Sequence, residues 1–180
     1  MLMNYAECIE KYGNAYQINK ALDDGLIHKL EEGIYSEEKF ASDVAILSKK
    51  YPQAVFTGAY AFYLHGLTDY IPDSYALATR SKAAPIADKR VAQVYTRDDL
   101  LMVGATIIPA EDTEILVYDK ERMLIELLRN KNKWPKDFYK EVIIRYRNTI
   151  ESLEIWRIQE YIEQFPKSGM IRRSFDEEVL

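Results

Sequence analysis

The hydrophobic pattern of this 180-residue sequence changes at Asp119, and the change limits the folds open to the chain. From Asp119 onward, apolar residues recur at the spacings of a helix face, and Asp119 itself can cap the first of these helices. Before Asp119, short β-branched and aromatic runs lie between turn residues, which is typical of strands. The strands are expected at 54–57, 75–79, 90–96, 106–108 and 114–118. Strands followed by helices, without regular alternation, predict an α+β fold.

The first 38 residues predict a small module of their own. Their pattern indicates helices over 3–12 and 14–24. Two short apolar runs then flank Glu31-Glu32-Gly33, which is typical of a β-hairpin. Two helices followed by a hairpin are the outline of a winged helix-turn-helix. We therefore expect a winged-helix-like module at 1–38 and an α+β domain, ending in several helices, at 39–180.

Three further helices are expected over 42–50, 58–65 and 136–148. Ser152 is expected to cap another, because its hydroxyl can accept from the free N–H groups of a first turn. That helix would end at Pro166. It is expected to bury one apolar stripe, made of Ile155, Trp156, Ile162 and Phe165.

Composition and charge exclude several classes of protein. The chain is 48% hydrophobic and carries 24 basic and 29 acidic residues, a net charge of −5, so we expect a folded protein and not a general nucleic-acid coat. The single cysteine, Cys8, excludes an intrachain disulfide and a cysteine metal cluster. The longest uncharged run, 54–67, is shorter than the roughly 20 apolar residues that a membrane span needs. We therefore expect no membrane partner and a cytoplasmic location.

Signals of catalysis are weak. A lone histidine such as His28 or His65 is more often a hydrogen-bonded structural residue than a ligand. His65 and Asp69, four residues apart, fit a metal or a proton relay less well than a pairing at the start of a loop. The sequence contains no glycine-rich phosphate loop and no Gly-x-Ser-x-Gly elbow. The acidic residues of 111–114 are best interpreted as a solvated hairpin tip. We expect no enzyme, and hence no catalytic residue, metal or cofactor.

Nucleic-acid binding has better support in the first module. Tyr16, Gln17, Asn19 and Lys20 share the expected outer face of helix 14–24, and Lys29 lies on the hairpin. Such side chains reach base edges or phosphates when they lie on a recognition helix or a wing. The charge opposes this hypothesis, because residues 1–50 carry six lysines, no arginine and nine acidic residues.

The positive charge of the chain is concentrated in residues 129–147, which hold seven basic and two acidic residues. One interpretation is a solvated helix face, with Glu141 and Arg145 as an ion pair one turn apart. The other is a docking surface for an acidic partner or an RNA, since arginine and aromatic residues are frequent in interface hot spots. The candidate partner-binding residues are Arg129, Lys133, Lys136, Lys140 and Arg147.

Three stretches, in their order and spacing, carry a family resemblance. They are LIHKLEEGIY at 26–35, FTGAYAFYLHGLT at 56–68 and VYDKERMLIELLR at 117–129. Together they resemble the AbiEi family, the antitoxins of type IV toxin–antitoxin systems.

The resemblance implies a protein of two parts. An N-terminal winged helix would bind operator DNA and repress its own operon, and the remainder would oppose a cognate nucleotidyltransferase toxin. The helices at 3–12 and 14–24 would correspond to the second and third helices of the family's module, whose first helix is missing here. The alternative is a stand-alone winged-helix regulator without a toxin partner.

The sequence pattern also predicts which side chains of the second and third stretches lie in the core, at its rim or in the first turn of a helix. Ala61, Phe62, Leu64 and Leu67 are expected in the core, and Tyr60, Tyr63 and His65 at its rim. In the third stretch, Glu121 and Arg122 are expected as charges of a helix's first turn, or else as partner contacts.

Overall fold

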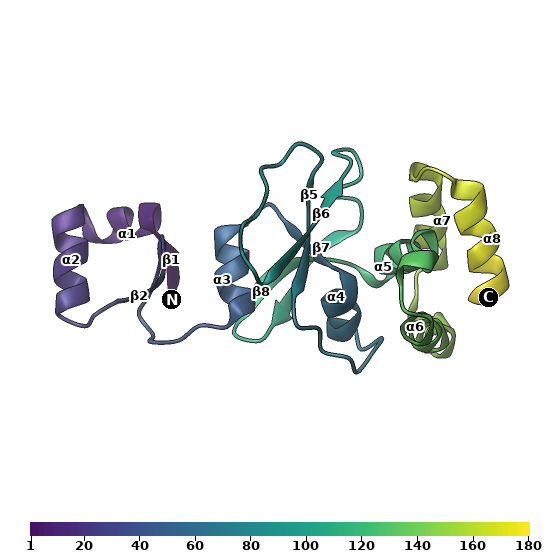
Figure 1. Cartoon of the computed structure of the whole chain (residues 1–180), viewed down its shortest axis with the longest axis horizontal. Helices are drawn as coiled ribbons and strands as arrows, with labels where there is room; N and C mark the ends of the chain where they lie inside the picture. Colours follow the sequence, from purple (N-terminus) through teal and green to yellow (C-terminus); the bar gives the residue numbers. More distant parts are fainter. The chain divides into compact units, whose positions relative to one another are not determined.

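The computed structural model describes residues 1–180 and confirms the expected α+β class (Figure 1). N-terminal helices with a small antiparallel sheet are followed by a five-stranded mixed sheet and then by helices. The chain divides into two compact units: the first is Met1–Gln53 with Ile107–Leu116, and the second is Ala54–Thr106 with Val117–Leu180. The predicted boundary after residue 38 stays a prediction. A membrane crossing is ruled out for every helix by its length and polarity.

The N-terminal module begins with a strand, which the sequence pattern did not predict. Strand β1 (Leu2–Asn4) precedes helix α1 (Tyr5–Tyr12), so the helix expected over 3–12 is wrong at its start. The reason is a capping box: Asn4 Oδ1 accepts from the Glu7 N–H at 2.9 Å, and the Glu7 carboxylate accepts from the Asn4 N–H at 2.7 Å. Asn4 is therefore the N-cap, and the residues before it are extended and free to pair with another strand.

The rest of the module follows the prediction. Helix α2 (Ala15–Asp23) is capped by Asn14, and strands β2 (His28–Glu31) and β3 (Ile34–Ser36) form the expected hairpin. The strand order is β1-β3-β2. The core of the module comprises Met3, Cys8, Ile18, Ala21, Ile27 and Tyr35. Cys8 is a fully buried core residue, and this burial raises the pKa of its thiol.

Helix α3 (Asp43–Lys50) packs on this module against β1 and β3, and Ser42, expected as its first residue, is its N-cap. Asp112, at the tip of the hairpin that ends the first unit, accepts from the Ser42 hydroxyl and, at 3.0 Å, from the Ser42 N–H. These bonds lower the pKa of Asp112. The hairpin tip is exposed as expected, but one of its acidic residues orders the start of α3.

The five-stranded sheet has the order β6-β5-β4-β8-β7. Its strands are β4 (Val55–Thr57), β5 (Tyr75–Arg80), β6 (Val91–Thr96), β7 (Ala105–Ala110) and β8 (Thr113–Tyr118). All five expected strands are confirmed. The adjacent strands β4 and β8 are parallel, with Phe56 opposite Val117. Helix α4 (Gly58–Leu64) follows β4, α5 (Lys120–Arg129) follows β8, and the two helices contact each other.

The C-terminal helices are α6 (Lys136–Asn148), α7 (Ile155–Gln164) and α8 (Ser168–Glu178), and α5, α7 and α8 pack together. Helix α6 has the expected bounds. Ser152 does not cap α7, because it lies in a short 3-10 helix and Glu154 precedes α7. Trp156 is 61% exposed, so the expected buried stripe is wrong at this position. Helix α8 was not predicted: Pro166 ends α7, but a new helix follows, and it buries Ile171 and Phe175.

Candidate functional site

The outer face of α2 presents the residues predicted to bind DNA. Ile18 and Ala21 turn into the core of the module, which leaves the opposite side of the helix exposed. On that side lie Tyr16, which is 72% exposed, and Gln17, Asn19 and Lys20, which are exposed as well. Lys29 is exposed on β2. DNA binding by these five residues stays a prediction.

Ion pairing within the first unit, which comprises the module, α3 and the hairpin at 107–116, occupies most of the unit's lysines. Lys29 pairs with Glu32 at 2.7 Å, Lys49 with Glu7 at 2.6 Å and Lys50 with Glu31 at 3.1 Å, and Lys11 pairs with Glu37. The hydrogen bond from Lys29 lowers the pKa of the Glu32 carboxyl, so this acid stays charged beside the predicted wing contact. Of the five candidate DNA contacts, Lys20 is the one cation outside an ion pair, which weakens the case for phosphate binding.

The basic segment 129–147 does not form one continuous surface. Lys136 and Lys140 line one pocket, whereas Arg129 and Lys133 line another. Arg147, near the end of α6, instead donates from Nε to the Glu178 carbonyl oxygen at 2.6 Å. The structure therefore separates the five candidate partner-binding residues into three places.

The pocket on α6 has a volume of about 470 Å³ and combines positive charge with aromatic walls. Lys136 and Lys140, one helical turn apart, are exposed and have no ion-pair partner. Trp134 forms part of the wall and stacks on Phe138 with a ring-centroid distance of 5.1 Å. Such a pocket can hold an acidic side chain whose apolar stem lies against an aromatic ring.

The expected pair between Glu141 and Arg145 does not form. Glu141 accepts from the Thr68 hydroxyl at 3.0 Å, and Arg145 pairs with Asp69 at 2.6 Å. The loop after α4 packs on α6 and offers both side chains closer partners. Because Asp69 pairs with Arg145, it does not pair with His65. The pairing of His65 with Asp69 at the start of the loop, which the sequence predicted, is therefore wrong as well.

His65 has a structural contact, as expected for a lone histidine. Its Nε2 lies 2.7 Å from the Tyr118 carbonyl oxygen, and burial lowers its pKa from the usual 6.5. Phe62 and Leu67 are buried as expected, whereas Leu64 is only half-buried and Tyr60, at 3% exposure, is a core residue and not a rim residue. No group of three or more His, Cys, Asp or Glu side chains is arranged to hold a metal ion.

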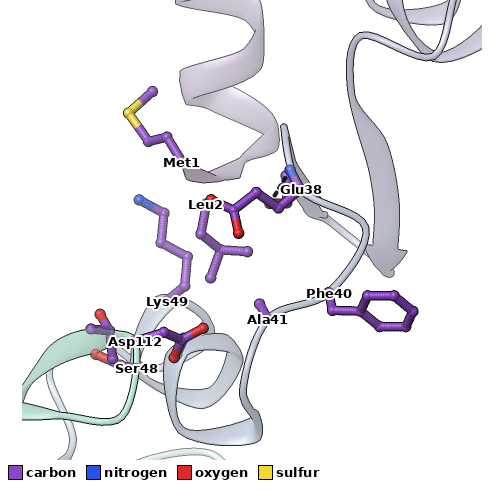
Figure 2. A pocket seen from close by; sticks show the side chains of 11 residues that line it. Met1, Leu2, Glu38, Phe40, Ala41, Ser48, Lys49 and Asp112 are labelled. Atoms are coloured by element: carbon purple, nitrogen blue, oxygen red, sulfur yellow. Dashed lines mark hydrogen bonds between the residues drawn. The ribbon is translucent and has the colours of Figure 1, made fainter.

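A further pocket, of about 360 Å³, lies in the first unit. Figure 2 shows Lys49 and Asp112 on its wall and the Phe40 ring turned away from the other labelled side chains. The Lys49 ammonium bonds Glu7, and the Asp112 carboxylate bonds Ser42. Because these two charges already have partners, this pocket offers less to a charged ligand than the pocket on α6.

Arg122 lies in the first turn of α5, as expected, but the sequence pattern did not predict the contacts of its side chain. Its side chain is fully buried, so it is not a partner contact. One guanidinium nitrogen donates to the Leu100 and Val103 carbonyl oxygens, each at 2.7 Å, and the others donate to Glu126 at 2.9 and 3.1 Å. Its guanidinium carbon lies 4.1 Å from the centroid of the Tyr118 ring. Arg122 thus ties the loop before β7 to α5.

No protein-family model matches the chain, and no curated protein is significantly similar to it. The likeness to AbiEi antitoxins therefore remains a resemblance carried by the three sequence stretches. In space, the stretch 26–35 contains β2 and most of β3. The stretches 56–68 and 117–129 contain α4 and α5 with the ends of the parallel strands β4 and β8.

Proposed function

We propose that the chain is an antitoxin that acts in the cytoplasm against a cognate nucleotidyltransferase toxin, as its resemblance to the AbiEi family implies. One observation carries this proposal. The stretches 56–68 and 117–129, far apart in sequence, lie on neighbouring parallel strands and on two helices that contact each other. The two stretches therefore form one structural unit of two strand–helix segments.

The pocket on α6 is the surface that best fits a protein partner. Lys136 and Lys140 are free of ion pairs, whereas Glu178, the one acid on this wall, pairs with Lys131 at 2.9 Å, so a partner's carboxylates can bind the two lysines without displacing it. Charges placed in this way chiefly set the orientation and the rate of association. In this proposal the antitoxin contacts an acidic segment of the toxin through these two lysines.

Co-expression tests the proposal. The proposal predicts that a neighbouring reading frame encodes a nucleotidyltransferase. That protein is expressed alone, with the wild-type chain and with the Lys136→Glu/Lys140→Glu variant, and growth is measured. We expect the wild type to restore growth and the variant to lose most of this effect. The matched control is Lys82→Glu/Lys89→Glu, two exposed lysines outside the basic segment, which should restore growth fully.

The outcomes separate the two parts of the proposal. Failure of the wild-type chain to restore growth rejects the antitoxin function. Full rescue by Lys136→Glu/Lys140→Glu keeps the antitoxin function and removes the α6 lysines from its mechanism.

A second candidate function, a DNA-binding regulator, is favoured by the exposed face of α2 above a complete β1-β3-β2 sheet. It is tested by gel shift of the chain's own upstream DNA over a series of salt concentrations. Affinity should fall as salt rises, and Lys20→Ala should reduce the slope of log affinity against log salt by about 1. The absence of a shifted band at low salt excludes this function.

A further inference from the structure

The pocket lined by Arg129 and Lys133 lies at the sheet of the second unit. Its volume is about 190 Å³, and its wall includes Thr57 and Tyr118, the last residues of the parallel strands β4 and β8. The register places Ala78 opposite Val55 and Val94 opposite Ala78, so the pocket lies across the face of strands β4, β5 and β6. A volume this far below the 300–1,000 Å³ of typical ligand pockets suits one small group, not a whole cofactor.

The charges around this pocket are unbalanced. Arg97, Arg129 and Lys133 contribute three positive charges, and Glu126 contributes the one negative charge. Both oxygens of Glu126 already accept hydrogen bonds, among them bonds from Arg129 and Asn130. The excess of two positive charges matches a phosphate monoester, which carries about −1.5 to −2 at neutral pH.

Several donors are available to an incoming anion. Lys133 is exposed and has no ion-pair partner. The pair between Arg97 and Asp99 joins side chains that are 59% and 60% exposed, so it is weak and Arg97 can leave it for a ligand. The Thr96 hydroxyl contacts the Val94 carbonyl oxygen at 3.4 Å and also the Tyr118 side chain, and it can turn from these contacts to a ligand. Cationic side chains and a hydroxyl that converge on one small pocket are a common arrangement for binding phosphate.

We propose that this pocket binds a phosphate group, held by Arg97, Arg129 and Lys133. The rest of the ligand, if any, lies outside the pocket. The group comes from free phosphate, a nucleotide or the phosphorylated end of an RNA. This inference does not rest on the antitoxin proposal, since it concerns a different pocket and different lysines from those on α6.

The test measures binding to the full chain by calorimetry and by the shift of its thermal unfolding. The probes are inorganic phosphate, adenosine 5′-monophosphate, and a short RNA with either a 5′-phosphate or a 5′-hydroxyl. We expect at least one phosphorylated probe to bind and the 5′-hydroxyl RNA to bind at least tenfold more weakly than its phosphorylated form. The tightest phosphorylated probe identifies the source of the group.

Two variants and a control locate the site. Lys133→Gln and Arg97→Gln should each weaken binding of the best probe about tenfold, because each removes a charged hydrogen bond. Lys89→Gln, an exposed lysine that lines neither this pocket nor the pocket on α6, should stay within twofold of the wild type. The proposal is overturned if no phosphorylated probe binds at millimolar concentration, or if all three variants weaken binding equally.

Discussion

At the scale of single residues, Arg122 shows how burial decides what a charge does. A guanidinium taken out of water is tolerated only when its donors find acceptors, and here they find two carbonyl oxygens and the Glu126 carboxylate. Arg129 bonds the same carboxylate from an exposed position. The two arginines therefore provide a matched pair for experiment.

Arg122→Lys should lower the free energy of unfolding by about 3 kcal/mol, because an ammonium cannot reach three acceptors that the planar guanidinium bonds together. Arg129→Lys should cost less than about 1 kcal/mol. Urea denaturation of both variants measures the difference. Equal losses would show that burial of Arg122 contributes nothing special.

Gly104, next to Arg122, has little tolerance for a side chain. Its φ is +74°, and a Cβ atom built on it would lie 2.4 Å from the Arg122 Cβ. Gly104→Ala should therefore lose about 3 kcal/mol or more, from backbone strain together with overpacking. Gly25→Ala, at φ +70° with open space around it, should lose only about 1 kcal/mol in the same denaturation experiment. A loss at Gly104 no larger than that at Gly25 would contradict the close packing.

His65 predicts a dependence of stability on pH. Burial lowers its pKa in the folded protein, so the unfolded chain binds a proton more readily below the usual pKa of 6.5. Its contribution to stability is therefore complete above pH 6.5 and is lost as the pH falls toward the lowered value. His65→Gln should flatten the decline in unfolding free energy between about pH 7.5 and 5.5. A steeper decline of the unfolding free energy in the variant would contradict the lowered pKa of His65.

At the scale of elements, the N-caps determine where the helices begin. Asn14 and Asp119, whose positions before a helical pattern fit caps, each accept from a backbone N–H of the first turn, and Ser42 does the same. Asn4 does the same, and its pairing with Glu7 explains why α1 begins two residues later than expected. Helix α7 has no side-chain cap, and it begins after Glu154, not after Ser152 as the pattern predicted.

The contact of Asp112 with the cap of α3 is open to measurement. Asp112→Ala should lower the free energy of unfolding by about 1 kcal/mol, because it removes the acceptor of two hydrogen bonds from Ser42. Glu114→Ala, an exposed acid on the same hairpin, should change stability by less than about 0.5 kcal/mol. If the two variants unfold alike, the bonds to Ser42 add nothing to stability.

At the scale of the whole molecule, ion pairing decides which charged side chains remain available to a ligand or partner. The overall composition does not show this. The net charge of −5 gives no indication that most lysines of the first 50 residues are held by glutamates. Nor does it show that Lys133, Lys136 and Lys140 are left without such partners. The structure therefore favours partner or phosphate contacts in the basic segment over phosphate contacts by the N-terminal module.

The sequence by itself determined the class of the fold, most of the strands and the starts of the helices that Asn14 and Asp119 cap. These depend on periodicity and on side chains within a few residues of each other, so local physics suffices. Only the tertiary structure decided that Arg122 is buried and that Trp156 is exposed. It also decided which acids hold the lysines and arginines, and it divided the basic segment between two pockets. Each of these depends on which distant segment packs against a residue, and no local pattern records that.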